Sequence, residues 1–167
     1  GLDWYLTGSE AQAAYGVPRQ TLDTDIVVAT TTDVLDRLAE ALRADYYYSE
    51  PLRFGRRTMA ALVDQRGAGK VDLIVRDPDP WGASAMARRV HWEHPTWGML
   101  WNSSLEDLIL AKLEWSEGTS ELQLGDCRTL LRMNAETLEG DYLDRWAATI
   151  GVDELLAAVR EEAADAS

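Results

Sequence analysis

The pattern of apolar and polar residues predicts strands and helices in the first hundred residues, and helices alone afterwards. Short apolar runs bounded by turn-forming residues indicate β-strands, whereas apolar residues three and four apart indicate helices. The predicted strands cover residues 4–7, 26–29, 46–48, 59–63 and 70–75, with further extended pieces around 91–92 and 98–101. The predicted helices of this part cover residues 10–15, 33–42 and 83–89. From residue 104 onward the pattern is typical of about four helices.

Three aspartates lie directly before or within two of the predicted strands. Asp23 and Asp25 are two residues apart and lead into an apolar run, so both carboxylates are expected on one face of a strand. Like charges held side by side repel unless a cation lies between them, and carboxylate oxygens are ligands that Mg²⁺ prefers. Asp72 is the one acidic residue inside the apolar run 71–75. If the strands are neighbours, the three carboxylates would hold two metal ions, which stabilise the attacking and leaving oxygens of an in-line displacement.

Gly8 and Ser9 follow the first predicted strand and precede the first predicted helix. Glycine permits a close approach of the backbone to a ligand, and serine caps the free N–H groups at the start of a helix. A helix N-terminus of this kind binds phosphate. Most Gly-Ser pairs are turns, so the pair gains its meaning from the aspartates that follow. The alternative without a function is that Asp23 is a turn residue, Asp25 a residue at the start of a strand, and Asp72 a chance placement.

Taken together, these motifs resemble the nucleotidyltransferase (polymerase-β-like) superfamily. The resemblance is carried by Gly8-Ser9, by Arg19-x-Thr21-x-Asp23-x-Asp25 and by Val71-Asp72-Leu73. It looks closest to the small bacterial and archaeal proteins related to the AbiEii/MenA toxin group. Downstream the similarity continues through residues 104–113, Asp126 with its Leu130-Leu131 run, and residues 142–147. It covers nearly the whole chain, although related sequences often carry Arg where this chain has Gly125.

The resemblance implies a fold and a reaction. The fold class is α+β, with a mixed β-sheet flanked by helices and followed by a C-terminal helical bundle. The expected domains are a nucleotidyltransferase core over residues 1–102 and a helical region over 103–167 that packs on it. The reaction is transfer of a nucleoside monophosphate from an NTP such as ATP to an acceptor hydroxyl, with release of pyrophosphate.

The resemblance also assigns roles to residues of this chain. Asp23 and Asp25 would bind both of two Mg²⁺ ions, and Asp72 would bind the catalytic ion and help activate the acceptor hydroxyl. These three are the expected catalytic and metal-binding residues. The expected nucleotide-binding residues are Gly8, Ser9, Arg19 and Lys112. For Lys112 the alternative is a lysine that exposes its ammonium group to solvent. Asp126 is expected either to orient a cation such as Lys112 or to form a structural salt bridge.

The motifs are compatible with two classes of function. The first is an active enzyme with an acceptor that is RNA, a protein or a small molecule. In the toxin group the acceptor is the 3′ end of tRNA, and a cognate antitoxin or other partner protein would then be expected. The second is a nucleotidyltransferase-fold binding or regulatory module, antitoxin-like, that no longer catalyses. The intact aspartates and Gly8-Ser9 favour the enzyme.

Composition and charge narrow the picture further. The net charge of −13 argues against broad, nonspecific binding of nucleic acid, which depends on Lys and Arg. No apolar run approaches about 18 residues, so no membrane span is expected. A single cysteine, Cys127, and no visible secretory signal suit the cytoplasm. His91 and His94 have no further ligands nearby in the sequence, so zinc binding is not expected. Related proteins have a helix before the first strand, and we expect one upstream of Trp4.

Overall fold

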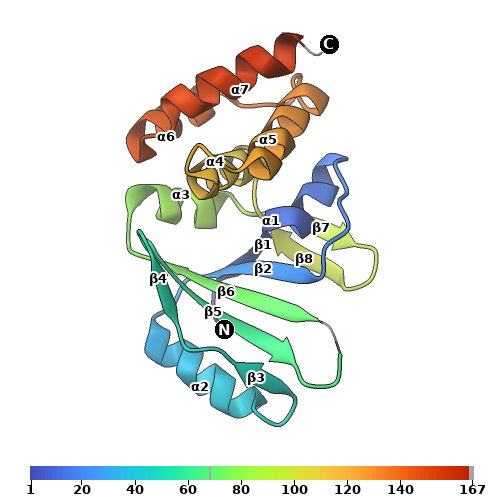
Figure 1. The fold of residues 1–167 in the computed structure, drawn as a ribbon, viewed down its shortest axis with the longest axis vertical. Helices are drawn as coiled ribbons and strands as arrows, with labels where there is room; N and C mark the ends of the chain where they lie inside the picture. Colours follow the sequence, from blue (N-terminus) through green and yellow to red (C-terminus); the bar gives the residue numbers. More distant parts are fainter. Residues whose placement is uncertain (68, 166–167) are drawn as a thin grey trace.

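The computed structural model describes residues 1–67 and 69–165, in which one mixed β-sheet is followed by four helices (Figure 1). The strands are β1 (Trp4–Thr7), β2 (Asp23–Val28), β3 (Tyr46–Tyr48), β4 (Leu52–Phe54), β5 (Arg57–Asp64), β6 (Lys70–Arg76), β7 (Val90–His94) and β8 (Gly98–Asn102). The helices are α1 (Gly8–Ala11), the 3-10 helix η1 (Gln12–Tyr15), α2 (Thr32–Leu42), α3 (Pro80–Arg88), α4 (Leu105–Ser116), α5 (Glu121–Met133), α6 (Gly140–Ile150) and α7 (Asp153–Asp165). The expected α+β class, with helices after the sheet, is confirmed.

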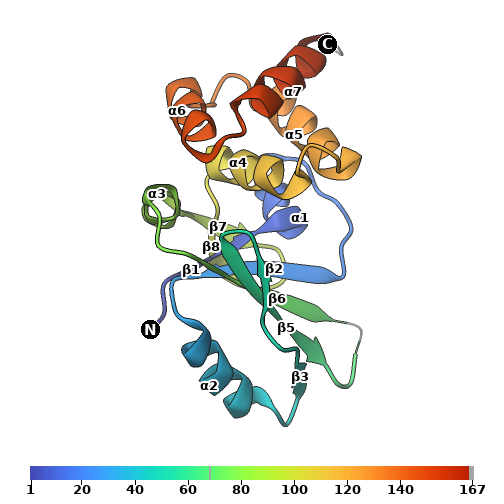
Figure 2. The ribbon, with the colours of Figure 1, turned by 60° about the vertical axis from the view of Figure 1, so that its left-hand side comes forward.

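The strand order β3-β5-β6-β2-β1-β8-β7 places the two aspartate strands side by side, and β4 pairs with β5. Strands β2 and β6 are parallel, and Asp25 is the register partner of Asp72. Alternate residues then divide between two faces of the sheet. We call the face that carries Asp23, Asp25 and Asp72 the aspartate face. On the opposite face Val28, Leu73 and their neighbours pack against helix α2, which lies at the lower end of the molecule in Figure 2.

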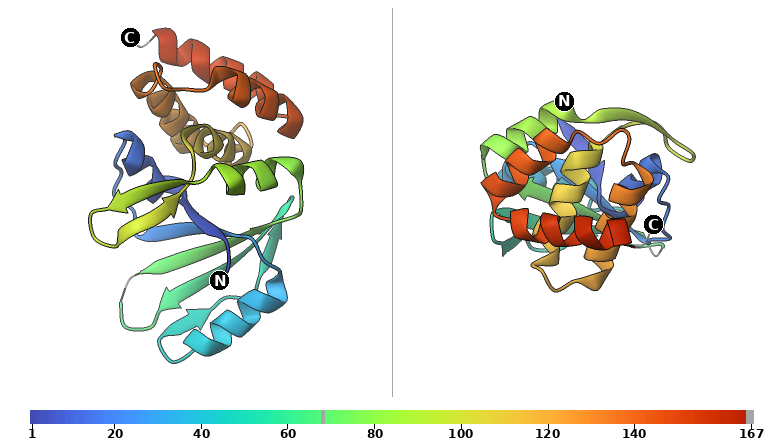
Figure 3. Two further views of the ribbon diagram at one scale, coloured as in Figure 1. Left: turned by 180° about the vertical axis from the view of Figure 1, so that it is seen from behind. Right: turned by 90° about the horizontal axis from the view of Figure 1, so that it is seen from above.

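The C-terminal helices enclose the larger apolar core. Leu108, Leu130 and Leu143, from three different helices, are completely buried in one cluster. Leu6 of β1 and Ala11 of α1 belong to the same cluster, so this core joins the sheet to the helices. Figure 3 shows the helices gathered at one end of the molecule, away from α2. The division into domains at residues 102 and 103 stays a prediction, although the last strand ends at Asn102 and α4 begins at Leu105.

Several element boundaries differ from those that the sequence predicts. The first helical turn begins at Gly8 itself and continues as a 3-10 helix to Tyr15. Helix α3 begins at Pro80 because Asp79 caps it, accepting a hydrogen bond of 2.7 Å from the N–H of Gly82. Strand β4 was not expected, since its three residues are exposed and show no apolar alternation. In the described part of the chain, none of the helices combines the length and apolar character that crossing a bilayer requires.

Candidate active site

A small cavity on the aspartate face brings together four of the predicted site residues, Gly8, Asp25, Asp72 and Lys112. Its volume is about 170 Å³. The polar side of this cavity is formed by Gly8, Asp25, Asp72, Lys112 and Gln123, and the apolar side by Met59, Ile74, Ala111 and Trp115. These residues come from the end of β1, the middle of β2, β5 and β6, and the helices α4 and α5. Segments that are distant in sequence therefore meet at one point.

Asp25 and Asp72 form the floor of this cavity because their strands are paired in register. Burial and the charges of Asp72 and Asp23 raise the pKa of Asp25 to about 6, from an ordinary value of 3.8. Desolvation is the largest of these causes. Asp72 is 5% exposed, and its Oδ1 has no hydrogen-bond partner among the described residues. An ionised pair in this position needs a cation.

Lys70 supplies part of that positive charge. It is the register partner of Asp23, and its Nζ lies 3.2 Å from Asp23 Oδ2 and 2.9 Å from Asp72 Oδ2. The carboxylates raise the pKa of Lys70, so its ammonium form is favoured. Positive and negative groups thus alternate across the two strands. Asp23 therefore forms an ion pair with Lys70, and 49% of its side chain is accessible to solvent.

The contacts of the three aspartates decide whether their carboxylate oxygens could bind a metal ion. In the described part of the chain, no three His, Cys, Asp or Glu side chains converge as a ready metal-binding group. Asp25 and Asp72 nevertheless offer hard oxygen atoms, one of them unpartnered, and a buried negative charge. These are features that fit a divalent cation such as Mg²⁺. Ligation by all three aspartates stays a prediction, since Asp23 would first have to release Lys70.

Gly8 is required where β1 ends. Its φ is +69°, in the left-handed region that favours glycine, and a Cβ atom here would lie 2.0 Å from Asp25 Oδ2. The backbone of the first helical turn therefore comes directly against the carboxylate. Ser9, the next residue, is buried, and its Oγ accepts a hydrogen bond from Arg19 Nη2.

Lys112 is buried rather than exposed, so the alternative of a solvent-exposed ammonium group is wrong. It is 2% exposed, and its Nζ donates to Asp126 Oδ2 at 2.7 Å and to Gln123 Oε1 at 3.3 Å. Arg19 Nε lies 3.8 Å from the same Asp126 oxygen. The structure thus joins Ser9, Arg19, Lys112 and Asp126 in one network beside Gly8. Two cations and a helix start form a cradle suited to phosphate oxygens.

Two features of the site were missed in the sequence. Trp115 packs against the apolar core and also lines the cavity, and the Arg57 guanidinium carbon lies 3.9 Å from the centre of its ring. Met59 lines the cavity from β5, although its apolar run predicted only a strand. Nothing local distinguishes these residues from ordinary core residues, because their role depends on which strand lies beside β6.

The remaining sequence candidates have structural roles. His94 Nε2 is 2.9 Å from Glu10 Oε1, and the ring of His91 stacks on Trp101. Cys127 is completely buried, and burial raises the pKa of its thiol to about 12.

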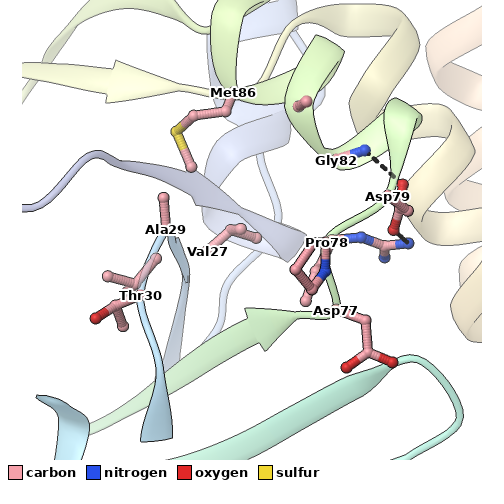
Figure 4. Close-up of a pocket in the computed structure, with 11 residues that line it drawn as sticks. Val27, Ala29, Thr30, Asp77, Pro78, Asp79, Gly82 and Met86 are labelled. Carbon is pink, nitrogen blue, oxygen red and sulfur yellow. Dashed lines mark hydrogen bonds and ion pairs between the residues drawn. The ribbon is translucent and has the colours of Figure 1, made fainter.

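A larger cavity of about 400 Å³ lies at the other end of β2 and β6. Val27, Ala29 and Thr30 line it together with Pro78 and with Met86 of α3 (Figure 4). It contains none of the predicted site residues. Its acids are already paired, Asp77 with Arg53 and Asp79 with Arg76, so we place the candidate active site in the smaller cavity.

Comparisons with known proteins agree on the fold. The chain is similar to the antibiotic-resistance factor ANT(2'')-Ia, whose solution structure aligns with a TM-score of 0.51 at 18% identity over 98% of this chain and 85% of that one. The crystal structure of ANT(2'')-Ia in complex with adenylyl-2''-tobramycin aligns with a TM-score of 0.52 at 17% identity over 96% of this chain and 88% of that one. The fold is therefore a nucleotidyltransferase fold. No family model and no curated protein sequence matches the chain.

Proposed function

We propose that this chain is a nucleotidyltransferase that moves a nucleoside monophosphate from an NTP to an acceptor hydroxyl. The observation that carries the proposal is the juxtaposition of two carboxylates with Lys112 and the backbone of Gly8 in one cavity. Asp25 and Asp72 line this cavity together with Lys112, and Arg19 contacts both Ser9, the residue after Gly8, and Asp126, the partner of Lys112. Transfer at phosphorus needs both parts, because the phosphates must be held and the developing charge stabilised.

The residues would divide the reaction as follows. Gly8, Ser9, Arg19 and Lys112 would bind the β- and γ-phosphates, which leave as pyrophosphate. The acceptor oxygen would form a bond to the α-phosphorus as the bond to the pyrophosphate oxygen breaks. Asp72 Oδ1, unpartnered among the described residues, would accept the hydrogen bond of the acceptor hydroxyl. Two Mg²⁺ ions bound by Asp23, Asp25 and Asp72 would supply positive charge to the phosphoryl oxygens.

The finer assignments extend this proposal. ATP is the proposed donor, since a neighbour of the same fold is described with an adenylylated product, adenylyl-2''-tobramycin. That product also supports a small-molecule acceptor. An RNA 3′ end, membership of the AbiEii/MenA group, a toxin role with a cognate antitoxin, and a cytoplasmic location all rest on the sequence motifs.

The test is label transfer from each α-³²P-labelled NTP in the presence of Mg²⁺, with total RNA, tobramycin and the protein itself as acceptors. Asp25→Asn is expected to lower transfer at least 100-fold, and Asp141→Asn, on an exposed part of α6, is the control that keeps activity. Gly8→Ala is expected to do the same as Asp25→Asn. Its control is Gly16→Ala, which has the same positive φ but no atom within 3.0 Å of the new Cβ.

Each outcome separates the two classes of function. Transfer by the wild type and loss in Asp25→Asn supports the enzyme, and the labelled species identifies the acceptor class. Transfer that persists in Asp25→Asn contradicts the assignment of the carboxylates. Binding of NTP by calorimetry without any transfer favours the non-catalytic binding module. Transfer that survives EDTA contradicts the requirement for magnesium.

A further inference from the structure

Three large apolar side chains are exposed on strands next to the candidate active site. Tyr47 of β3 is 65% exposed, Leu52 of β4 is 60% exposed, and Phe54 of β4 is 41% exposed. Residues paired across antiparallel strands share a face of the sheet. Leu52 pairs with Met59, which pairs with Ile74, and Met59 and Ile74 line the active-site cavity. The exposed residues of β4 therefore belong to the aspartate face.

The pairing of strands β3, β5, β6 and β2 places Tyr47 on the same face. It pairs with Val63, Val63 pairs with Lys70, and Lys70 pairs with Asp23. The opposite face of these strands packs under α2. The aspartate face thus carries the exposed apolar side chains of Tyr47, Leu52 and Phe54, and exposed apolar patches beside a polar site mark binding surfaces.

Trp115 connects this surface to the cavity. Its ring lies 6.3 Å from the ring of Phe54 and lines the cavity together with Met59. Arg57, which is 6% exposed, stacks on the indole and is held by Glu114 at 3.1 Å. The indole is fixed in place by these contacts. We call Tyr47, Leu52, Phe54, Met59 and Trp115 the apolar platform.

The direction of the proposed reaction points across this platform. Gly8 and Ser9, which would hold the leaving pyrophosphate, follow β1, and the carboxylates stand on β2 and β6. In an in-line displacement the attacking and leaving oxygens lie on opposite sides of the phosphorus. The attacking oxygen therefore arrives from the side opposite β1, which is the side of β5 and β4.

The chemistry of the platform restricts the acceptor. None of its five members carries a charge. The Arg57 guanidinium already occupies the indole, so a cationic acceptor would meet like charge there. A polyanion finds little support on a chain with a net charge of −13, in which the nearby Lys70 is paired with two carboxylates. Aromatic side chains instead favour stacking with a flat ring.

We propose that the platform binds the acceptor, and that this acceptor is a neutral small molecule with a hydroxyl group and a ring that stacks on the aromatic side chains. The inference rests on the proposed nucleotidyltransferase activity and names the acceptor class of the same site.

The test uses phenyl β-D-glucopyranoside as a neutral, ring-bearing hydroxyl probe and tobramycin as a polycationic one. Amide and indole ¹H–¹⁵N spectra of the full chain are recorded during each titration, with a separate titration of ATP and Mg²⁺. The glucoside is expected to shift Tyr47, Leu52, Phe54 and the Trp115 indole signal at millimolar concentration. Leu52→Ser and Phe54→Ser are expected to weaken its binding at least fivefold. Leu122→Ser on α5, where the side chain is 55% exposed, is the matched control and leaves binding unchanged.

The results separate this inference from the proposed function. If ATP shifts Gly8 and Ser9 but the glucoside shifts no platform residue at 10 mM, the inference is wrong and the proposed function stands. If ATP binds nowhere, the proposed function itself fails. Stronger binding of tobramycin or of a short RNA to the platform overturns the neutral acceptor. A concentration-dependent dimer that Leu52→Ser dissociates would show that the platform is a protein interface.

Discussion

At the scale of the residue, the site is built from charges that balance one another over short distances. Asp25 is half-buried beside Asp72, while Lys70 lies between Asp72 and Asp23. Burial together with like charge makes the ionised Asp25 unfavourable, which raises its pKa to about 6. The ionised acid therefore destabilises the fold, and a neutral side chain would suit the same position better.

Asp25→Asn is expected to stabilise the protein at neutral pH while it abolishes transfer. The folded protein holds the Asp25 proton up to about pH 6, whereas the unfolded chain loses it near pH 3.8. The folded state therefore binds more protons in this window, and stability falls as the pH rises from 4 to 6. The gain at pH 7 is at most roughly 3 kcal/mol and disappears near pH 3.5. Urea unfolding in EDTA measures it, with Asp141→Asn as the control. Equal stability of Asp25→Asn and wild type at pH 7 would contradict the expectation.

At the scale of the element, one buried carboxylate ties helix α4 to two strands. Glu114 accepts hydrogen bonds from Arg76 of β6 at 2.7 Å, and it pairs with Arg57 of β5 at 3.1 Å. The side chains of Arg57 and Arg76 are 8% and 9% exposed, respectively. Arg57 also stacks on Trp115, the residue after Glu114. The triad therefore sets the position of the cavity's apolar wall.

Glu114→Gln is expected to lower the free energy of unfolding by about 3 kcal/mol, because it leaves the buried Arg57 guanidinium without its paired carboxylate, while Arg76 keeps Asp79 at 3.3 Å. Glu121→Gln is the matched control, since Glu121 pairs with Arg128 at 3.1 Å but its side chain is 81% exposed. That exposed pair contributes less than about 1 kcal/mol. Chemical denaturation of both variants measures the difference. Similar small losses in the two variants would show that the triad is not an important link.

At the scale of the whole molecule, sheet and helices share one core. Leu6 and Ala11, from the first strand and helix, lie in the same buried cluster as residues of α4 to α7. All the described strands lie within residues 4–102, with β1 between β2 and β8, so the helices after Asn102 cover a sheet that the first unit builds. The predicted units 1–102 and 103–167 would each expose a large apolar surface if they were separated.

We therefore expect the whole chain to unfold in a single cooperative transition. Tryptophan fluorescence and far-ultraviolet circular dichroism should give the same midpoint in urea, because loss of either half exposes the apolar cluster that joins the sheet to the helices. The separate fragments 1–102 and 103–167 are expected to lack a cooperative transition. Two distinct midpoints, or a fragment that folds alone, would instead support two independent domains.

Much of the site could be predicted from residues that are close in the sequence. The spacing of Asp23 and Asp25 is enough to put both on one face of a strand, and Gly8-Ser9 stands where a strand leads into a helix. Asp126 was expected either to orient a cation such as Lys112 or to form a structural salt bridge, and the structure pairs these two side chains. The extra strand β4 escaped prediction because three exposed residues carry no periodic pattern.

The sequence by itself determined the kinds of chemistry available and the elements that carry them, because strand and helix periodicity depend on neighbouring residues. It is the tertiary structure that places β6 beside β2, Lys70 between two carboxylates, and Trp115 against both the cavity and the apolar core. It also left the side chains of β3 and β4 uncovered next to the site. These features depend on contacts between distant segments, and the free energy of those contacts comes from the packing of the whole chain.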